Sequence, residues 1–580
     1  MGNAPKSAYE IALEKLRQRD RERGEEAPAA LSDEQKERIA EIRKAHEARV
    51  AEREILFRSE RAKLLADPEA AEKLARLEEG HAGDRRRLQD RLESEIAAAR
   101  AGKEAPGRKA AGEGEQARGN KGSGGGAGKG RGGRKKVAAT CVAIGIGLGL
   151  AAPAGRAATT PSGAGGGEVI VLRAARLLDG TDAPVREKVQ VVVEGDRIRS
   201  IGPAAPVPAR ARVIDLGGAT LLPGWIDAHT HVLLQGDPTA RSYEDQILKE
   251  SIPRRTIRGV AAARAALLNG FTTLRDLGTE GAGYADVAIR DGIAEGHIVG
   301  PRLLVATLAL DITGAYPLVG FAPESQVPSG VQVADGPHAG RAAVREQIKH
   351  GADWIKVYCD RGYFVNEAGR LDSIPTFDPD ELAAIVDEAH RQGRRVAAHA
   401  MAPKGIANAL DAGVDSIEHG VGLDAASIRR MAARGVYYCP TLTVTQYVAP
   451  ARAAEGRGIW ARIPDFHRRS FEAALKGGVR IAFGSDAGGF PWSTSQAEEF
   501  LWMVRYGMTP AQAIRSATTV AAALLGRENE IGRIAPGYRA DLVAVPGNPL
   551  DDIDLMRRVG FVMAGGVVHK HDLRGGEQDG

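Results

Sequence analysis

Two histidines, His229 and His231, stand one residue apart at the end of the apolar stretch Leu221-Leu-Pro-Gly-Trp-Ile-Asp-Ala-His-Thr-His231. On an extended chain, residues i and i+2 project to the same side of the strand. The two imidazoles therefore point together from the end of a strand, which suits two nitrogen ligands on one divalent metal ion. Two polar residues that merely close a strand would give the same pattern. The hypothesis of a metal site therefore depends on further ligands elsewhere in the chain.

The segments that must position these histidines alternate between short apolar runs and helix-prone runs across residues 223–527. We expect strands at residues 225–227, 272–275, 302–306, 354–357, 396–399, 415–418, 436–440 and 480–485. Helices are expected between them, for example at 341–349, 378–391, 424–433 and 466–476. Eight β/α units predict an α/β fold with a (β/α)8 TIM barrel, and a doubly wound sheet is the alternative on pattern alone.

Further metal-binding residue types fall at the predicted strand ends, where the catalytic groups of a barrel lie. They are Lys356, His399, His419 and Asp486. The chain has only 13 His, and four of them occupy these positions, which favours a metal site over a set of structural histidines. Neutral imidazoles bind zinc-like ions, and Asp486 can bind a metal and also accept a proton from metal-bound water.

Lys356 is the unusual member of this set, because a protonated lysine repels a metal ion. It fits if its amine has reacted with carbon dioxide, which gives a carbamate whose two oxygens can bridge two cations. The alternative is a surface lysine paired with Asp353 or Asp360, and the sequence leaves both interpretations open.

The order and spacing of these motifs resemble the amidohydrolase superfamily over residues 168–570. The resemblance is greatest to the imidazolonepropionase-like and Xaa-Pro dipeptidase-like branch with a carboxylated lysine. The motifs that carry it are Pro223-Gly-Trp-Ile-Asp-Ala-His-Thr-His231, Thr272-Thr-Leu-Arg-Asp-Leu-Gly278, Gly351-Ala-Asp-Trp-Ile-Lys356, Ser416-Ile-Glu-His-Gly420, Gly484-Ser-Asp-Ala-Gly488 and Ile531-Gly-Arg-Ile-Ala-Pro-Gly537.

The resemblance implies a centre of two divalent metal ions, expected to be zinc. His229, His231 and Asp486 would hold one ion, His399 and His419 the other, and carboxylated Lys356 would bridge them. A hydroxide between the metals would attack an amide carbonyl, with Asp486 as the catalytic residue that moves the proton. The implied substrate is a small amide or short peptide, such as a dipeptide or an N-acyl amino acid. A deaminase, a lactonase and a non-catalytic scaffold are the alternatives.

The substrate-binding part of the family pattern is altered in this chain. Dipeptidases similar to it often carry Gly-Gly-His after the third strand and a tyrosine soon after the fifth-strand histidine, and these grip a carboxylate. Here the matching stretches are Thr313-Gly-Ala-Tyr316 and His399-Ala-Met401. The candidate replacements are Tyr316, Tyr358, Arg361 and Tyr363.

Three other residue groups near the predicted strand ends have structural interpretations. For Arg275 and Asp276 we favour an ion pair that fixes the rim of the barrel over a catalytic role. Cys359 and Cys439 are expected to be small core residues. Because the chain has only three cysteines, it has no disulfide framework.

The flanks of the alternating region, residues 168–222 and 528–572, contain short β-strand segments separated by turns. We expect them to pair into a small β-sandwich into which the barrel, residues 223–527, is inserted. The net charge is +4 over 580 residues, so no global field argues for nucleic acid as a partner. Homo-oligomerisation stays open.

The first 136 residues have a different composition. Residues 1–100 are charged and helix-prone with a thin apolar stripe, which predicts a helical hairpin or a weak coiled coil. Its charged face is either simply solvated or the site of an unknown partner. Residues 101–136 are rich in Gly, Lys, Arg and Ala and predict a disordered linker.

Residues 137–158 combine a basic flank, a short apolar core and a small-residue exit, the pattern of a signal peptide. Three hypotheses account for it. We favour a true start near Arg134, which predicts a periplasmic or secreted mature chain that begins near Ala158. The alternatives are a membrane anchor at residues 137–155 and an apolar linker in a cytoplasmic protein.

Overall fold

The computed structural model of the chain describes residues 168–203, 208, 210–316, 318 and 320–573, together with Arg38 and Ile42, which are helical. The chain divides into two compact units, Met1–Leu148 and Gly149–Gly580, and the elements below belong to the second. Apart from Arg38 and Ile42, the segments predicted at 1–100, 101–136 and 137–158 lie outside the described residues. Within the described part, no helix is long and apolar enough to cross a membrane.

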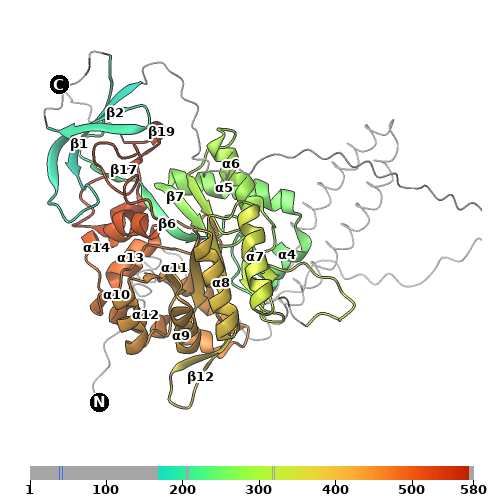
Figure 1. The fold of residues 1–580 in the computed structure, drawn as a ribbon. Coiled ribbons are helices and arrows are strands. Elements are labelled where there is room, and N and C mark those ends of the chain that lie inside the picture. Colours follow the sequence, from blue (N-terminus) through green and yellow to red (C-terminus); the bar gives the residue numbers. More distant parts are fainter. Residues whose placement is uncertain are drawn as a thin grey trace, which may run out of the picture. The chain divides into compact units, whose positions relative to one another are not determined.

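One eight-stranded sheet joins the two ends of the described chain. Its strand order is β19-β18-β17-β5-β1-β2-β3, with β4 paired to β1. In Figure 1 the teal strands β1 and β2 lie close to the red strands β17 and β19. The strands are β1 (Val169–Leu177), β2 (Arg186–Glu194), β3 (Arg197–Gly202), β4 (Arg212–Asp215), β5 (Thr220–Pro223), β17 (Leu542–Val545), β18 (Phe561–Ala564) and β19 (Val567–His571).

The two flanks meet in this sheet where β5 pairs antiparallel with β17, with Leu221 opposite Ala544. Alternate residues of the sheet point into one apolar core, which includes Leu172, Val191 and Phe561. The chain leaves the sheet at Pro223, directly before the strand that carries His229 and His231. The position of the two histidines therefore follows from the end of this sheet.

Parallel strands form the centre of the unit. One set is β6 (Trp225–Thr230), β7 (Phe271–Asp276) and β8 (Arg302–Val305). The other, in the order β10-β9-β11-β14-β15-β16, contains β9 (Ala309–Asp311), β10 (Val331–Val333), β11 (Trp354–Tyr358), β14 (Arg395–Ala400), β15 (Ser416–His419) and β16 (Tyr437–Cys439). All six residues of β6 and of β7 are buried, as expected for parallel strands that are covered on both faces.

The segment predicted as a strand at residues 480–485 is irregular. Ile481 forms a parallel bridge with Tyr438, and Ala487 forms one with Thr230, so the segment links the last strand to the first. Its ladder is interrupted because the amide of Phe483 donates to the carbonyl of Ser516 instead of to a neighbouring strand. The sequence prediction of a regular strand here is therefore wrong in its extent.

Helices separate the parallel strands in the sequence and lie outside them in Figure 1. Asp378 begins α8 with a capping box, in which Glu381 bonds back to the cap, and Gly413 and Gly435 end α9 and α10 in the left-handed conformation that favours glycine. The helices are α4 (Ala240–Lys249), α5 (Ile252–Leu268), α6 (Ala285–Ala294), α7 (Pro337–Lys349), α8 (Pro379–Arg391), α9 (Pro403–Ala412), α10 (Ala425–Arg434), α11 (Leu442–Ala454), α12 (Ile463–Lys476), α13 (Glu498–Arg505), α14 (Pro510–Arg515), a π-helix at Ser516–Val520, and α15 (Ala521–Leu524).

Two elements that the sequence did not predict follow the strand ends. A hairpin of β12 (Asp360–Val365) and β13 (Leu371–Pro375) comes directly after β11. A short 3-10 helix, η1 (Gly458–Ala461), comes after α11. Tyr363 of the hairpin makes an edge contact with Trp460 of η1, so the two elements meet. A second 3-10 helix, η3 (Ile553–Arg557), precedes β18.

Candidate active site

A cavity of about 1060 Å³ contains the residues that the sequence singled out. The six predicted metal ligands line it together: His229, His231, Lys356, His399, His419 and Asp486. The four predicted substrate contacts, Tyr316, Tyr358, Arg361 and Tyr363, lie on its wall as well. Residues from β6, β11, β14, β15 and the segment after Ile481 thus meet in one place, as parallel strand ends do.

His229, His231 and Asp486 form the tightest group, because their potential ligand atoms all lie within 4.8 Å of one another. Oδ1 of Asp486 is 3.7 Å from Nε2 of His229 and 3.4 Å from Nε2 of His231. The other ring nitrogen of each histidine is engaged. Nδ1 of His229 lies 2.8 Å from Oε2 of Glu418, and Nδ1 of His231 lies 2.9 Å from the carbonyl of Gly278. These acceptors set the ring orientation that a metal ligand needs.

The chemistry of this group fits a cation. Nε2 of His229 is buried and has no hydrogen-bond partner among the described residues. Burial and the nearby Lys356 hold the pKa of His229 well below its ordinary value and lower the pKa of His231 to about 4, so both rings are neutral. Burial and the charge of Asp237 raise the pKa of Asp486 well above its ordinary value. Neutral nitrogens with free lone pairs beside a destabilised carboxylate are stabilised by a bound metal ion.

Lys356, His399 and His419 form a second group beside the first. The rings of His399 and His419 are 4.5 Å apart, and those of His229 and His419 are 5.0 Å apart. Nδ1 of His419 lies 2.8 Å from Oγ1 of Thr441, and Nε2 of His399 lies 2.7 Å from the hydroxyl of Tyr363. Each of these histidines therefore keeps one ring nitrogen available.

Lys356 is buried, with 1% of its surface exposed. The surface ion pair considered for it is not formed, because Asp353 pairs with Arg290 at 2.9 Å and Asp360 accepts the amides of Met401 and Ala402. Burial lowers the pKa of Lys356. A larger fraction of its amine is therefore neutral, which is the form that reacts with carbon dioxide.

The backbone is strained at three positions of this site. His419, Asp486 and Thr441 have φ values of 70°, 61° and 53°, in the left-handed region that side chains with a Cβ rarely adopt. Such outliers persist only where the surroundings fix them, and they cluster at functional sites. Gly488 also lies close to His231, since a Cβ at Gly488 would come within 2.2 Å of the His231 carbonyl oxygen.

A buried ion pair lies beside the first group, and it differs from the pair of Arg275 with Asp276 that the sequence predicts. Arg275 pairs with Oε1 of Glu418 at 2.9 Å and lies over the ring of Trp354 at 4.4 Å. Asp276, the partner expected for Arg275, instead accepts the amide of Val232 at 2.7 Å. Neighbouring residues of a strand point to opposite sides, which separates Arg275 from Asp276.

Two further carboxylates support the site and were not predicted. Asp227 accepts the amides of Ser485 and His229 at 2.9 and 3.2 Å, and burial raises its pKa to about 6. It thereby ties the first strand to the loop that carries Asp486. Glu280 accepts hydrogen bonds from Tyr243 at 2.7 Å and from Tyr358 at 3.2 Å, and burial raises its pKa.

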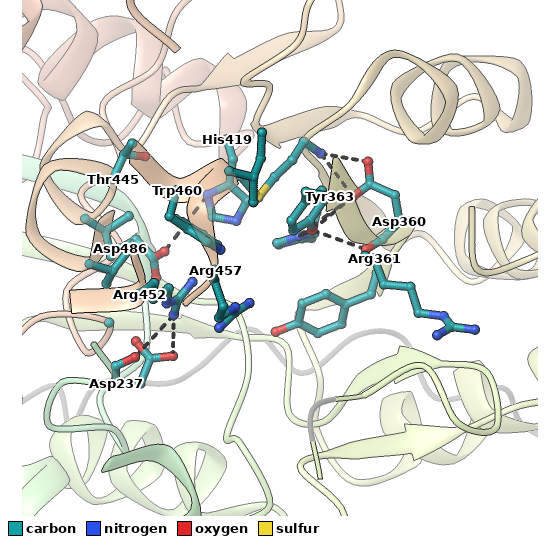
Figure 2. A pocket seen from close by; sticks show the side chains of 18 of the residues that line it. Asp237, Asp360, Arg361, Tyr363, His419, Thr445, Arg452, Arg457, Trp460 and Asp486 are labelled. Atoms are coloured by element: carbon teal, nitrogen blue, oxygen red, sulfur yellow. Dashed lines mark hydrogen bonds and ion pairs between the residues drawn. The ribbon is translucent and has the colours of Figure 1, made fainter. Parts of the chain in front are cut away.

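The wall formed by α11 and η1 is rich in guanidinium groups. Arg452 contacts Asp237 at 3.3 Å and lies 4.4 Å from the ring of Trp460, and the guanidinium of Arg457 is 5.5 Å from the same ring. Figure 2 shows these four residues together at the cavity. Burial raises the pKa of Asp237 to about 6 although Arg452 opposes this shift. We call Arg452, Arg457 and Trp460 the arginine wall.

Residues 220–568 of this chain match the sequence model of the amidohydrolase family. The chain belongs to the amidohydrolase family. An ochratoxinase of Aspergillus niger is 31% identical over 435 residues, which cover 70% of this chain and 87% of that protein. An imidazolonepropionase of Cutibacterium acnes is 29% identical over 389 residues, which cover 62% of this chain and 87% of that protein.

The fold leads to the same family. A crystal structure of a Xaa-Pro dipeptidase with methionine bound in its active site matches with a TM-score of 0.63 and 32% identity, and covers 70% of this chain and 100% of that chain. The predicted resemblance to imidazolonepropionase-like and dipeptidase-like amidohydrolases is confirmed, and so is the mixed α/β fold.

Some of the supporting residues that were not predicted for this amidohydrolase do have a signal in the sequence. Arg275 and Glu418 stand in segments that the barrel pattern predicts to be buried strands, and two opposite charges in buried strands are a signal for an internal ion pair. Asp227 stands two residues before His229 and therefore points to the same side of the strand. The arginine wall gives no such signal, because its residues are spread over the end of α11, the loop after it and η1.

Proposed function

We propose that this amidohydrolase uses two divalent metal ions, expected to be zinc, to hydrolyse the carbon–nitrogen bond of a small amide such as a dipeptide or an N-acyl amino acid. The observation that carries the proposal is the position of Asp486. Its carboxylate faces Nε2 of both His229 and His231 in a cavity that Lys356, His399 and His419 also line. Neutral buried histidines around a carboxylate and a lysine supply the donor set that divalent metal ions bind.

The residues divide between the two metal ions as the family resemblance implies, and the close grouping of His229, His231 and Asp486 supports the first of the two sites. His229, His231 and Asp486 would hold one ion, and His399 with His419 would hold the other. Lys356, which is buried within this group, would bridge them as a carbamate formed from its neutral amine and carbon dioxide with loss of a proton. Bound divalent metals lower the pKa of water and polarise a carbonyl group.

Asp486 is the residue proposed to move the proton. The burial and the repulsion by Asp237 that raise its pKa make its carboxylate a stronger base than an ordinary aspartate. It accepts the proton of the attacking water and donates it to the leaving nitrogen, which departs as a neutral amine. Tyr358 lies at the end of the strand that carries Lys356 and lines the cavity.

The substrate of this site is proposed to carry a carboxylate. The guanidinium groups of Arg361, Arg452 and Arg457 line the cavity, and arginine binds carboxylates through paired hydrogen bonds. Tyr316, which is hydrogen-bonded to Tyr243, and Tyr358 complete the proposed substrate contacts. The methionine bound by the similar dipeptidase is itself an amino acid with a carboxylate, which supports this choice.

The test uses zinc-loaded protein with paired substrates. Each dipeptide or N-acyl amino acid is offered with its free carboxylate and as the carboxamide, and the released amine is quantified. We expect hydrolysis that a chelator abolishes and a preference for the free acid. The variant Arg457→Gln should narrow this preference, whereas the exposed Arg469→Gln should leave it unchanged.

The same experiment separates the alternative functions. Release of ammonia from an exocyclic amine would indicate a deaminase, and hydrolysis of lactones without hydrolysis of amides would indicate a lactonase. Zinc-loaded protein that turns over none of these substrates would contradict the proposal and favour a non-catalytic scaffold.

Two finer features of the chain also belong to the proposal. The bridges from Ile481 to Tyr438 and from Ala487 to Thr230 support closure of the parallel strands into a (β/α)8 barrel inserted in a β-sandwich. We also propose that the chain is exported through residues 137–158. N-terminal sequencing of protein purified from cells tests this, since an intact Met1 on cytosolic protein would contradict export. Hydrolysis that survives deletion of residues 1–157 would show that these residues are not catalytic.

A further inference from the structure

One of the four histidines in the site is oriented differently from the others. His229, His231 and His419 each engage Nδ1 with a polar partner, and Nε2 of His229 and of His231 faces the carboxylate of Asp486. His399 does the opposite, because its Nε2 lies 2.7 Å from the hydroxyl of Tyr363. The partner also differs in origin, since Tyr363 comes from the β12–β13 hairpin rather than from the end of a central strand or the turn after it.

The hydroxyl of Tyr363 has two sets of neighbours and a single proton. Besides His399, it lies 3.2 Å from Oδ1 and 3.3 Å from the carbonyl oxygen of Asp360. These oxygens only accept hydrogen bonds while Asp360 is ionised. If the phenol donates to Asp360, its oxygen accepts the Nε2–H of His399, and both contacts are satisfied. If the phenol donates to His399 instead, a lone pair of the Tyr363 oxygen faces a lone pair of Asp360, and no proton lies between the two oxygens.

Asp360 is held as an acceptor by the surrounding backbone. Its buried carboxylate accepts the amides of Met401 and Ala402 and the hydroxyl of Ser373 at 2.8–3.1 Å. These bonds fix the carboxylate relative to the loop after His399. Figure 2 shows Tyr363 and Asp360 side by side at the cavity. The ring of Trp460 contacts the ring of Tyr363 from the side of η1, so the phenol is confined as well.

We infer that Tyr363, together with Asp360, is a positioning residue that holds His399 in the tautomer with Nε2–H and thereby leaves Nδ1 as the nitrogen that binds metal. This inference rests on the proposed two-metal function. It assigns Tyr363 to the support of a ligand rather than to the grip on a substrate carboxylate. Removal of the phenol oxygen should weaken the second metal and leave the first unchanged.

The test compares Tyr363→Phe with wild type and with Tyr447→Phe, a half-exposed tyrosine outside the cavity lining. Metal-free protein labelled with 15N-histidine reports the tautomer of His399 by NMR, with His399→Gln to assign the signal. We expect the Nε2–H form in wild type and in Tyr447→Phe, and a mixture of tautomers in Tyr363→Phe. The Nδ1–H form in wild type would overturn the inference, whatever the metal content.

A zinc titration against a chromophoric chelator gives the second readout. Tyr363→Phe should weaken one of two zinc sites by about 10- to 100-fold, with kcat reduced and KM nearly unchanged. A raised KM with both zinc affinities intact would instead show that Tyr363 grips the substrate. Wild type that binds no second zinc would contradict the proposed function, and the tautomer measurement would still decide the inference.

Discussion

The two halves of the candidate metal centre are supported by different parts of the fold. The half formed by His229, His231 and Asp486 is held by Glu418, Asp227 and the carbonyl of Gly278, all at or next to the central strands. The half formed by Lys356, His399 and His419 is held by Tyr363 and Thr441, which lie on the hairpin and at the start of α11. The first half is therefore supported by the central strands and the turns after them, whereas the second half also depends on Tyr363 from an added hairpin.

The difference in support predicts a difference in metal affinity between the two halves. Groups fixed by buried strands need no ordering when a ligand binds, so the first half should bind its metal tightly. One support of the second half, Tyr363, lies on the largely exposed strand β12, and exposed elements open more readily than buried strands. We therefore expect the second metal to be weaker and to be the one that responds to changes outside the strands.

The largest effect is expected from Asp486→Asn. This variant removes a ligand of the first half and the proton carrier, so kcat should fall by about 10³-fold and the metal content should drop. Activity assays and elemental analysis of the same preparation measure both. A kcat within tenfold of wild type would show that another group moves the proton.

Lys356→Ala should affect the second half selectively. Loss of the bridging carbamate should reduce kcat by at least about 100-fold and remove one of the two metals, while the first half keeps its ion. Native mass spectrometry distinguishes protein that holds one metal ion from protein that holds two. Full activity with one metal per chain would refute the bridging role.

Glu418→Gln should lower the stability of the protein and weaken metal binding by the first half. The change leaves Arg275 buried without its counter-charge, which costs about 3–5 kcal/mol of unfolding free energy, and reduces the support of His229. Denaturant unfolding with a zinc titration measures both effects. The matched control is Glu472→Gln, which removes an exposed pair with Arg468 worth at most about 1 kcal/mol. Equal losses in the two variants would contradict the structural role of Glu418.

The smallest effect concerns Glu499, which holds the start of α11 beside Thr441. Its carboxylate accepts the amides of Leu442 and Thr443 at 2.8 and 2.7 Å, and burial raises its pKa from 4.5 to about 7. The folded state therefore binds the proton of Glu499 more tightly than the unfolded state. As pH rises from 4.5 to 7 that advantage is lost, and the free energy of unfolding falls by about 3 kcal/mol. Melting temperatures measured at several pH values should depend less steeply on pH for Glu499→Gln than for wild type. Parallel slopes would contradict the assigned shift.

The candidate ligands could be predicted from the sequence because they are local features of strands. His229, His399 and His419 lie at the ends of predicted strands and Lys356 lies within one, and parallel strands bring such residues to one edge. Their supports were less accessible to sequence reasoning. Tyr363 reaches His399 only because a hairpin folds back over the strand ends, and the bulge in that hairpin between Arg361 and Phe364 has no clear sequence signal.

The errors have the same physical origin. Arg275 was matched to Asp276 because the two are adjacent, whereas its partner Glu418 lies on another strand at a long sequence distance. The strand predicted at residues 480–485 breaks because Phe483 bonds to Ser516, a contact that depends on the position of α14. Contacts between distant segments decide these details, and one sequence does not contain them.

Zinc-edge anomalous diffraction from crystals of the zinc-loaded protein tests the central claim most directly. The account predicts two peaks in the cavity. One should lie about 2.0–2.2 Å from ligand atoms of His229, His231 and Asp486, and the other at a similar distance from His399 and His419, with carbamate density on Lys356. A single peak beside an unmodified Lys356 would contradict it.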